Sequence, residues 1–227
     1  MAEPYKDVYI PEELKFPQTG VCHQNKSRPY VIFNMVSSVD GRASLQCSSK
    51  TDRRVMAQLR SQVDGVVWGG GTIRTDPIAL KLPDDLIPVK LPVGIVWTRS
   101  GHLPGGHPLF LHCPRLVFTM AKKRSLGDLE ARHLVHYVSS VEEMLFILWQ
   151  TYHIKTLLVE GGATFNRLLL EQNIGEELFL TLASFLVGDQ TDTILQSGLT
   201  KPLSLKLRSV KQVENDLYLR YQIIAAP

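Results

Sequence analysis

The hydrophobic positions fall into short runs of strand length, separated by stretches in which apolar residues recur at helical spacing. The runs predict β-strands, which we place at residues 30–36, 65–68, 93–98, 116–119, 134–138, 156–159 and 178–182. The intervening stretches predict helices at 52–62, capped by Thr51 or Asp52, after residues 140–143, where Ser140 and Glu143 form a capping box, and at 163–172. Two longer alternating runs, 203–214 and 217–224, flank Asn215-Asp216 and predict a β-hairpin.

Alternation of strands and helices is typical of an α/β fold with a mostly parallel sheet and helices on both faces. The C-terminal hairpin predicts an antiparallel edge on that sheet. Residues 1–29 are polar and proline-containing, and we interpret them as an N-terminal arm that straps the surface or a partner subunit. Residues 30–227 are predicted to form a single domain, in which 77–92 and 101–114 are loops rich in proline or glycine.

Composition narrows the class of protein. Hydrophobic residues make up 44% of the 227 positions, charged residues 21%, and the net charge is only +3. These values exclude a disordered chain and speak against a dedicated nucleic-acid partner. The longest apolar run, residues 144–149, is too short to span a membrane. Three widely spaced cysteines, Cys22, Cys47 and Cys113, make neither a disulfide framework nor a zinc site, so we expect a cytoplasmic protein without a bound metal.

Two glycine clusters follow directly after predicted strands. They are Gly69-Gly70-Gly71-Thr72 and Glu160-Gly161-Gly162-Ala163-Thr164-Phe165. Sheets of this kind bind ligands at the carboxyl ends of their strands, and glycine lets the backbone approach a phosphate. The second cluster leads into a helix, whose first N–H groups favour anions, so it is the better phosphate site. The alternative is that both clusters are tight strand-to-helix turns and nothing more.

Four charged residues are candidates for chemistry. Arg99 follows a strand between two hydroxyl residues, where it can hold the 2′-phosphate of an NADP-type cofactor or simply face solvent. Arg60 stands next to core-facing Leu59, where a buried guanidinium would need an anion. Glu160 ends an apolar strand, so its carboxylate must be paired or protonated, and it can bind a heterocycle or transfer a proton. Asp40 precedes Gly41 in a predicted turn near the same edge.

Together these motifs resemble the reductase domain of bacterial and archaeal riboflavin biosynthesis, which has a dihydrofolate-reductase-like fold. The resemblance covers residues 30–224. It rests on an ordered set of motifs, namely Ser38-Val39-Asp40-Gly41-Arg42, Leu59-Arg60-Ser61-Gln62-Val63-Asp64-Gly65, Gly69-Gly70-Gly71-Thr72, Asp76-Pro77 and Leu158-Val159-Glu160-Gly161-Gly162-Ala163-Thr164-Phe165-Asn166. It implies a three-layer αβα fold, a homodimer, and NADPH-dependent reduction of a phosphoribosylaminopyrimidine to its ribitylamino product.

The resemblance also implies roles for individual residues. The implied NADPH contacts are Val36, through its backbone, Gly71, Thr72, Asp76, Thr98, Arg99, Gly161, Gly162, Ala163, Thr164 and Phe165. The implied substrate contacts are Asn34, Ser48 or Ser49, Arg60, Leu80 and Glu160, with Arg60 on the phosphate. Glu160 and Asp40 are the implied catalytic residues, which hold the polar substrate and assist proton delivery.

The chain departs from the bifunctional bacterial members in two ways. Asn34 stands where many of them carry lysine, and no deaminase domain is present in the sequence. Both an aminated and a deaminated pyrimidine fit the motifs. Two other functions stay open at this point, a reductase of dihydrofolate or a related pterin on the same fold, and a non-catalytic nucleotide-binding relative.

Overall fold

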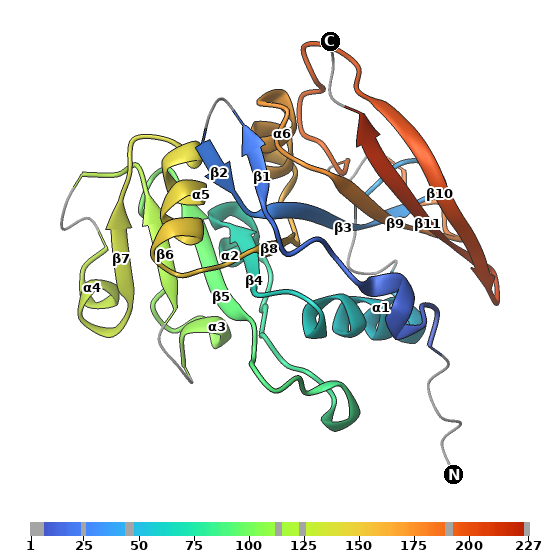
Figure 1. The fold of residues 1–227 in the computed structure, drawn as a ribbon, viewed down its shortest axis with the longest axis horizontal. Coiled ribbons are helices and arrows are strands. Elements are labelled where there is room, and N and C mark those ends of the chain that lie inside the picture. The colour runs from blue at the N-terminus through green and yellow to red at the C-terminus, as the bar shows by residue number, and fades with distance from the viewer. Residues whose placement is uncertain are drawn as a thin grey trace.

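The main sheet has nine strands, in the order β10-β11-β9-β3-β8-β4-β5-β6-β7 (Figure 1). The structure is a computed structural model that describes residues 7–23, 26–43, 48–111, 115–122, 126–188 and 193–224. The strands are β3 (Tyr30–Ser38), β4 (Gly65–Gly69), β5 (Val93–Thr98), β6 (Leu116–Thr119), β7 (Leu134–Tyr137), β8 (Thr156–Val159), β9 (Glu177–Ala183), β10 (Ser204–Val213) and β11 (Asp216–Ile224). Strands β3 to β9 pair in parallel, whereas β11 pairs antiparallel with β9 and β10. The predicted fold class is therefore confirmed.

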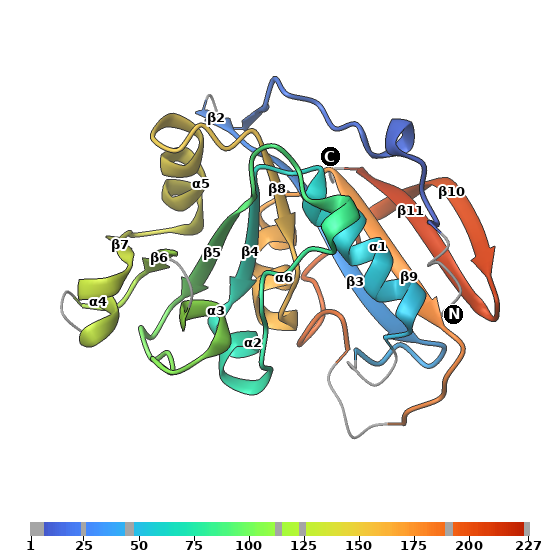
Figure 2. The same ribbon diagram turned by 90° about the horizontal axis from the view of Figure 1, so that it is seen from below.

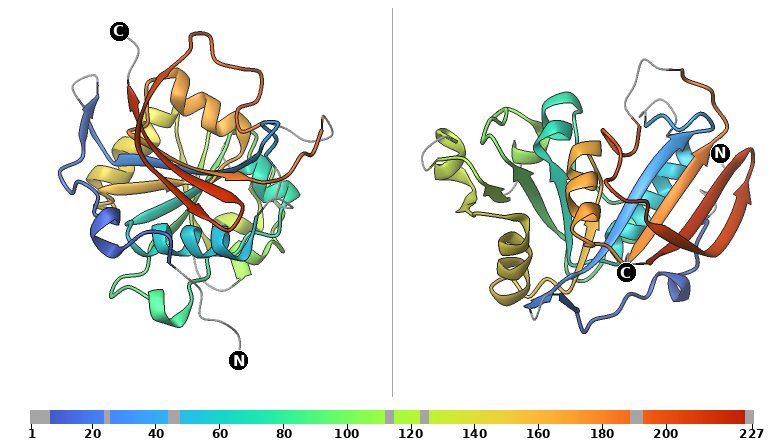
Figure 3. Two further views of the ribbon diagram at one scale, coloured as in Figure 1. Left: turned by 90° about the vertical axis from the view of Figure 1, so that its right-hand side faces the viewer. Right: turned by 90° about the horizontal axis from the view of Figure 1, so that it is seen from above.

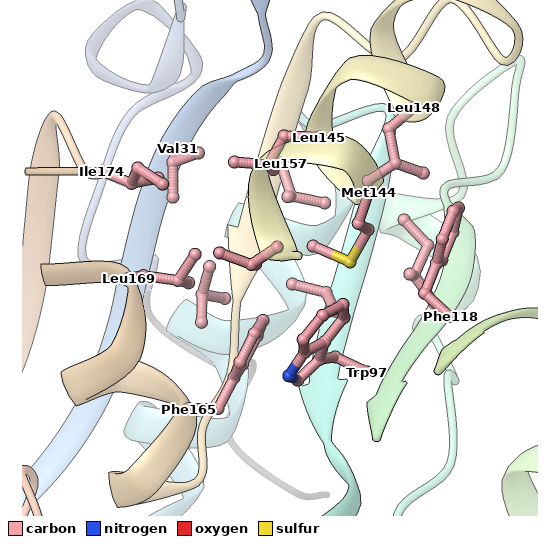
Figure 4. Close-up of a cluster of buried hydrophobic side chains, with 14 of the residues drawn as sticks. Val31, Trp97, Phe118, Met144, Leu145, Leu148, Leu157, Phe165, Leu169 and Ile174 are labelled. Atoms are coloured by element: carbon pink, nitrogen blue, oxygen red, sulfur yellow. The ribbon is translucent and has the colours of Figure 1, made fainter. Parts of the chain in front are cut away.

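Helices cover both faces of this sheet. They are α1 (Lys50–Ser61), α2 (Gly70–Thr75), α3 (Pro108–Leu111), α4 (Asp128–Arg132), α5 (Val141–Gln150) and α6 (Ala163–Glu171), with short 3-10 turns η1 (Pro11–Leu14) and η3 (Asp84–Leu86). One face packs against α5 and α6, and Figure 4 shows Met144, Leu145, Phe165 and Leu169 converging there. The other face packs against α1 to α4 and the N-terminal arm, and Figure 2 shows α1 lying along β3 and β9.

Local capping signals set the helix starts. The N-cap of α1 is Ser49, whose hydroxyl accepts a hydrogen bond from the Asp52 N–H at 3.1 Å, so the prediction of Thr51 or Asp52 as the cap is wrong. The predicted capping box of α5 is confirmed, because the Ser140 hydroxyl accepts from the Glu143 N–H at 3.2 Å. These caps fix the first turn of each helix.

Proline-rich and glycine-rich segments hold more structure than predicted. The predicted loop 101–114 contains α3, because Pro108 fits the first position of a helix. The first glycine cluster itself opens α2, and α4 was not predicted. The segment 77–92 is a loop apart from η3. Cys22 is exposed, while Cys47 and Cys113 lie outside the described residues. Nowhere in the described chain is a helix both long and apolar enough to cross a membrane.

The N-terminal arm packs on its own domain. It contains a small two-stranded sheet, β1 (Val21–His23) with β2 (Lys26–Arg28). Tyr9 and Phe16 meet Phe179 of β9 edge to face, with ring centroids 5.3 and 6.1 Å apart. The Gln58 side chain of α1 donates to the Tyr9 carbonyl at 2.7 Å. The arm thus covers the part of the sheet beside α1, next to the hairpin β10–β11, which forms one edge of the sheet in Figure 3.

Candidate active site

The space between α1 and the centre of the sheet is partly accessible, and we call it the cleft. Residues of β3 alternate between faces, and Ile32, Asn34 and Val36 share the face that α1 covers. Ile32 is fully buried, whereas Asn34 and Val36 are half-exposed although β3 lies in the middle of a nine-stranded sheet. Met56, on α1, is also half-exposed. Because these residues of β3 and α1 remain partly accessible to solvent, α1 does not cover the sheet completely here.

The two glycine clusters meet at one side of this cleft. They follow the neighbouring parallel strands β4 and β8, and the Gly69 N–H donates to the Gly161 carbonyl at 2.7 Å. A Cβ atom on Gly162 would lie only 2.8 Å from the Thr72 hydroxyl oxygen. Gly161 has φ +92°, which favours glycine, and the Gly161-Gly162 peptide is cis. The close contact of the two turns therefore requires glycine at both residues.

The surroundings of the glycine turns suit a dinucleotide. Gly71 is exposed and a Cβ there would meet nothing within 4 Å, so backbone is open to a ligand at this point. The first N–H groups of α6, at Ala163 and Thr164, have no partner inside the helix. Thr98 ends β5 beside Gly70, and the exposed Arg99 follows it. Open backbone, a helix start and a nearby cation are the features that bind a pyrophosphate and a further phosphate.

Arg74 is a cation at this end of the sheet that sequence reasoning did not single out. It is exposed in the last turn of α2, and its guanidinium donates to the His102 carbonyl at 3.2 Å. Its position four residues after Gly70, on the same short helix, is the signal that could have identified it. Asp76 lies at the C-terminal end of α2, and its carbonyl contacts the His107 ring at 2.7 Å.

Phe165, one of the implied cofactor contacts, has its side chain in the core. Its ring is 4% exposed and stacks on Trp97 in the core with centroids 6.1 Å apart. Its N–H already donates to the Gly162 carbonyl at 2.9 Å. Phe165 instead fixes the start of α6 against the sheet, because both its side chain and its N–H are used within the protein.

Arg60 and Glu160 form a buried ion pair at the floor of the cleft. The guanidinium Nε and Nη2 atoms bind the two carboxylate oxygens at 2.8 and 2.6 Å, and the side chains are 4% and 6% exposed. The Trp68 indole N–H also donates to Glu160, at 3.0 Å. Arg60 in turn donates to the carbonyl of Ala79, the residue before Leu80, at 3.3 Å. The expectation that the Glu160 carboxylate is paired is confirmed, and its partner is the other predicted site residue.

Asn34 lies beside this pair. Phe33 of β3 is in register with Val159 of β8, so the next residues along, Asn34 and Glu160, are neighbours on the α1 side of the sheet. The structure thus brings together Asn34, Arg60 and Glu160, three residues that the resemblance implies as substrate contacts, from β3, α1 and the end of β8. The predicted phosphate contact of Arg60 would have to compete with Glu160 for the guanidinium.

Asp40 lies at the rim and anchors a loop. It accepts hydrogen bonds from the Ser38 hydroxyl at 2.5 Å and from the N–H groups of Val187 and Gly188, the latter at 2.7 Å. These bonds, that of Ser38 first, lower the pKa of Asp40 to about 2. A carboxylate surrounded by donors from its own chain suits an anchor better than the proton donor that the sequence suggested.

Asp52 is a buried carboxylate that sequence reasoning treated only as a helix cap. It is 7% exposed, the Ser48 hydroxyl donates to it at 2.7 Å, and Thr181 of β9 is near enough to lower its pKa together with Ser48. Burial is the main cause of the raised pKa of Asp52. Ser49, a predicted substrate contact, is the neighbouring cap, 3.4 Å from the Tyr218 hydroxyl. Asp52 and Arg60 are eight residues apart, hence on one helix face, and this spacing could have revealed Asp52.

No metal cluster accompanies these residues in the described part of the chain, where no three His, Cys, Asp or Glu side chains come together suitably. The cleft therefore offers an ion pair, a second buried carboxylate, an amide and a glycine-lined cradle. These groups can bind a polar heterocycle beside a nucleotide.

Comparison with known proteins gives consistent matches. A curated 2,5-diamino-6-ribosylamino-4(3H)-pyrimidinone 5′-phosphate reductase from Methanothermobacter thermautotrophicus is 26% identical, over 86% of this chain and 99% of the relative. Among solved structures, RibD from Acinetobacter baumannii aligns with a TM-score of 0.75 at 22% identity, over 87% of this chain and 58% of that one. The riboflavin biosynthesis reductase Rib7 of Saccharomyces cerevisiae gives 0.71 at 20% identity, over 87% and 90%.

These structural matches confirm the dihydrofolate-reductase-like fold that the resemblance implied. The relatives are named as reductases, which supports the predicted oxidoreductase. The RibD C-terminal domain family model matches residues 29–219, which include both glycine clusters, Arg60 and Glu160. On this match the chain belongs to the RibD C-terminal domain family.

Proposed function

We propose that this protein is an NADPH-dependent reductase that converts the ribosyl side chain of a phosphoribosylaminopyrimidine to a ribityl chain in riboflavin biosynthesis. The observation that carries the proposal is the meeting of the two glycine turns beside the buried Arg60–Glu160 pair. A cofactor cradle and a polar floor lie next to each other, as hydride transfer between two bound molecules requires. The names of the relatives agree with this reaction.

The cofactor side would be formed by the turns at Gly71, Thr72 and 161–164, with Val36, Asp76 and Thr98 beside them. Bound NADPH would supply the hydride. Arg99 and Arg74 are both exposed cations near the end of β5, and they support a preference for the 2′-phosphate of NADPH. We expect Arg99→Ala to raise the KM for NADPH about tenfold and to leave the KM for NADH unchanged, since only the phosphate contact is lost.

The substrate side would be formed by Asn34, Ser49, Arg60, Leu80 and Glu160. The hydride adds to C1 of the ring-opened ribose in its imine form, and the electron pair of the C=N bond moves to the nitrogen. Protonation of that nitrogen makes the carbon a better acceptor. Glu160, which Arg60 and Trp68 hold in place, would stabilise the protonated imine electrostatically. Asp40 would hold the rim loop at 187–188 over this site.

The test is NADPH oxidation with three compounds offered separately: the aminated pyrimidine of the relatives' name, its deaminated uracil counterpart, and dihydrofolate. Turnover with either pyrimidine supports the proposal, whereas turnover with dihydrofolate alone would replace it. Glu160→Gln should lower kcat about 100-fold while the Kd for NADPH stays within about threefold, because the charge is needed in the transition state. Glu171→Gln, a change of the same kind on the exposed side of α6, is the matched control and should keep normal kcat.

A homodimer completes the proposal. The edge strand β10 exposes Leu205, Leu207 and Val210, and an exposed apolar edge favours pairing with a second copy. The double variant Leu205→Lys with Leu207→Lys should be a monomer in light scattering after gel filtration. Leu134→Lys, at an exposed apolar residue of β7 on the opposite edge of the sheet, should leave the dimer intact. The cytoplasm is the compartment we propose, because three widely spaced cysteines are not the sequence pattern of a disulfide framework.

A further inference from the structure

Asp52 is the buried titratable group that the proposed reaction leaves without a role. It occupies the first turn of α1 and is 7% exposed. Ser49, and not Asp52, caps the helix, so the carboxylate is not needed as the cap. The Ser48 hydroxyl, from the chain before α1, donates to it at 2.7 Å, and Thr181 of β9 is near enough to oppose the rise that burial causes in its pKa. Asp52 therefore points from the helix toward the sheet.

The carboxylate lies at the cleft. Thr181 is the register partner of Val36, a half-exposed residue of β3 on the side that α1 covers. Asp52, Met56 and Arg60 follow at intervals of four residues, so they line one side of α1. Asp52 and Arg60 are about two helical turns apart on α1, so the same helix carries Asp52 and the arginine that binds Glu160. One end of the cleft thus holds an ion pair and the other holds Asp52.

Asp52 has no cation to neutralise it within the described residues. The ion pairs of that part of the chain use Asp7, Glu13, Asp85, Glu160, Glu171, Glu176 and Glu177. Asp216, itself 8% exposed, adds a second negative group nearby. A buried carboxylate with only hydroxyl partners costs free energy, which a ligand with two adjacent N–H donors would recover. Asp52 should therefore favour ligand groups that donate hydrogen bonds over ligand groups that accept them.

We propose that Asp52 is a specificity-determining residue that binds the 2-amino group and the adjacent N3–H of the pyrimidine, and so selects the aminated substrate over the deaminated one. The inference rests on the proposed function, since it assumes that a pyrimidine occupies the cleft. In the aminated ring both groups are donors, and together they match the two oxygens of one carboxylate. Deamination replaces the 2-amino group by a carbonyl oxygen, which would face Asp52 as a second acceptor.

The experiment measures equilibrium binding of both pyrimidines to the full chain saturated with oxidised NADP, so that no turnover occurs. The wild type should bind the aminated compound about 10- to 150-fold more tightly, the range expected for a hydrogen bond to a charged group. Asp52→Asn should weaken the binding of the aminated compound by a similar factor. It should strengthen the binding of the uracil, because the amide offers one acceptor to N3–H and one donor to the 2-carbonyl.

Two controls separate recognition from a structural role. Asp85→Asn removes a carboxylate that contacts α1 from its outer side, through Arg54, and should change neither affinity. Thermal unfolding of Asp52→Asn reports whether the variant is folded. If Asp52 only held α1 in place, the affinity of the variant for both ligands would fall by the same factor. Equal losses, or wild-type affinities within about threefold of each other, would overturn the proposal.

Binding and turnover together distinguish the two proposals. Selective binding of the aminated compound without NADPH oxidation would reject the reductase function and retain Asp52 as the recognition residue. Oxidation with the uracil, bound at least as tightly as the aminated compound, would retain the function and reject the role of Asp52. Failure of both compounds to bind would reject both proposals.

Discussion

The cleft contains two buried carboxylates that the chain treats differently. Glu160 receives a bidentate guanidinium and an indole N–H, so its charge is balanced before any ligand arrives. Among the described residues Asp52 forms no ion pair; it accepts a hydrogen bond from the Ser48 hydroxyl, and the negative charge of Asp216 acts on it. The Glu160 side chain is 6% exposed, and Asp52 as a whole residue is 7% exposed. Burial alone therefore does not explain the difference. The difference lies in what each carboxylate has as a partner.

This contrast shows how one fold can reserve two carboxylates for two tasks. A carboxylate neutralised within the protein is fixed in position and can act on charge that develops nearby. A carboxylate without a cation is held at an energetic cost, and that cost makes its site selective for a ligand with donors. Changes to either set of partners should therefore have separable effects on stability and on recognition.

Breaking the ion pair should have the largest effect. Arg60→Ala or Glu160→Ala should lower the free energy of unfolding by about 3–5 kcal/mol, because each leaves a buried charge without its partner. Urea denaturation measures this change. Replacing both residues by methionine should restore much of the stability, since no unpaired charge remains. Arg167→Ala, which breaks a partly exposed pair with Glu171 at 3.9 Å, should cost less than about 1 kcal/mol. Equal losses for the buried and the exposed pair would contradict this account.

The ion pair also shows how far sequence reasoning reaches. Strand and helix positions followed from periodicity, because the sheet is buried on both faces and most strands are short apolar runs. Arg60 and Glu160 could each be identified, but they are 100 residues apart in sequence, and only the fold shows that they neutralise each other. Asp52 was missed because an aspartate near a helix start is normally a cap. The short helices α2 and α3 were missed because glycine and proline usually mark loops.

The indole N–H of Trp68 should account for the next largest effect. Trp68→Phe keeps an aromatic ring in the core and removes the donor that reaches Glu160 at 3.0 Å. A hydrogen bond to a charged group contributes about 1.5–3 kcal/mol, and we expect a loss of that order in the free energy of unfolding. Trp97→Phe, a matched change whose indole is not bound to a carboxylate, controls for lost ring volume. Identical losses for the two variants would show that ring volume, and not the N–H donor, supports Glu160.

Replacing Asp52 should stabilise the folded protein, whereas the changes above should destabilise it. Burial raises its folded-state pKa above the unfolded value, so the native protein is favoured while Asp52 is protonated, and this advantage disappears as the pH rises through the folded-state pKa. Asp52→Asn removes the buried charge. Its Tm should equal that of the wild type near pH 4 and exceed it increasingly toward neutral pH. A Tm difference that does not change with pH would show that Asp52 is not charged at a cost in the folded protein.

Asp40 should have the smallest effect on stability, because it is a third carboxylate placed in solvent. Its folded-state pKa of about 2 lies below the usual value near 4, so its contribution is present above about pH 4 and is lost as the pH falls through about 2. Asp40→Asn should change global stability little, since exposed groups interact weakly. Hydrogen exchange at the Val187 and Gly188 amides should accelerate in the variant at pH 6, and this acceleration over the wild type should shrink toward pH 2. Unchanged exchange at these two amides would mean that the Asp40 carboxylate does not hold the rim loop. Substrate selection in the cleft would then depend on Glu160 and Asp52 alone.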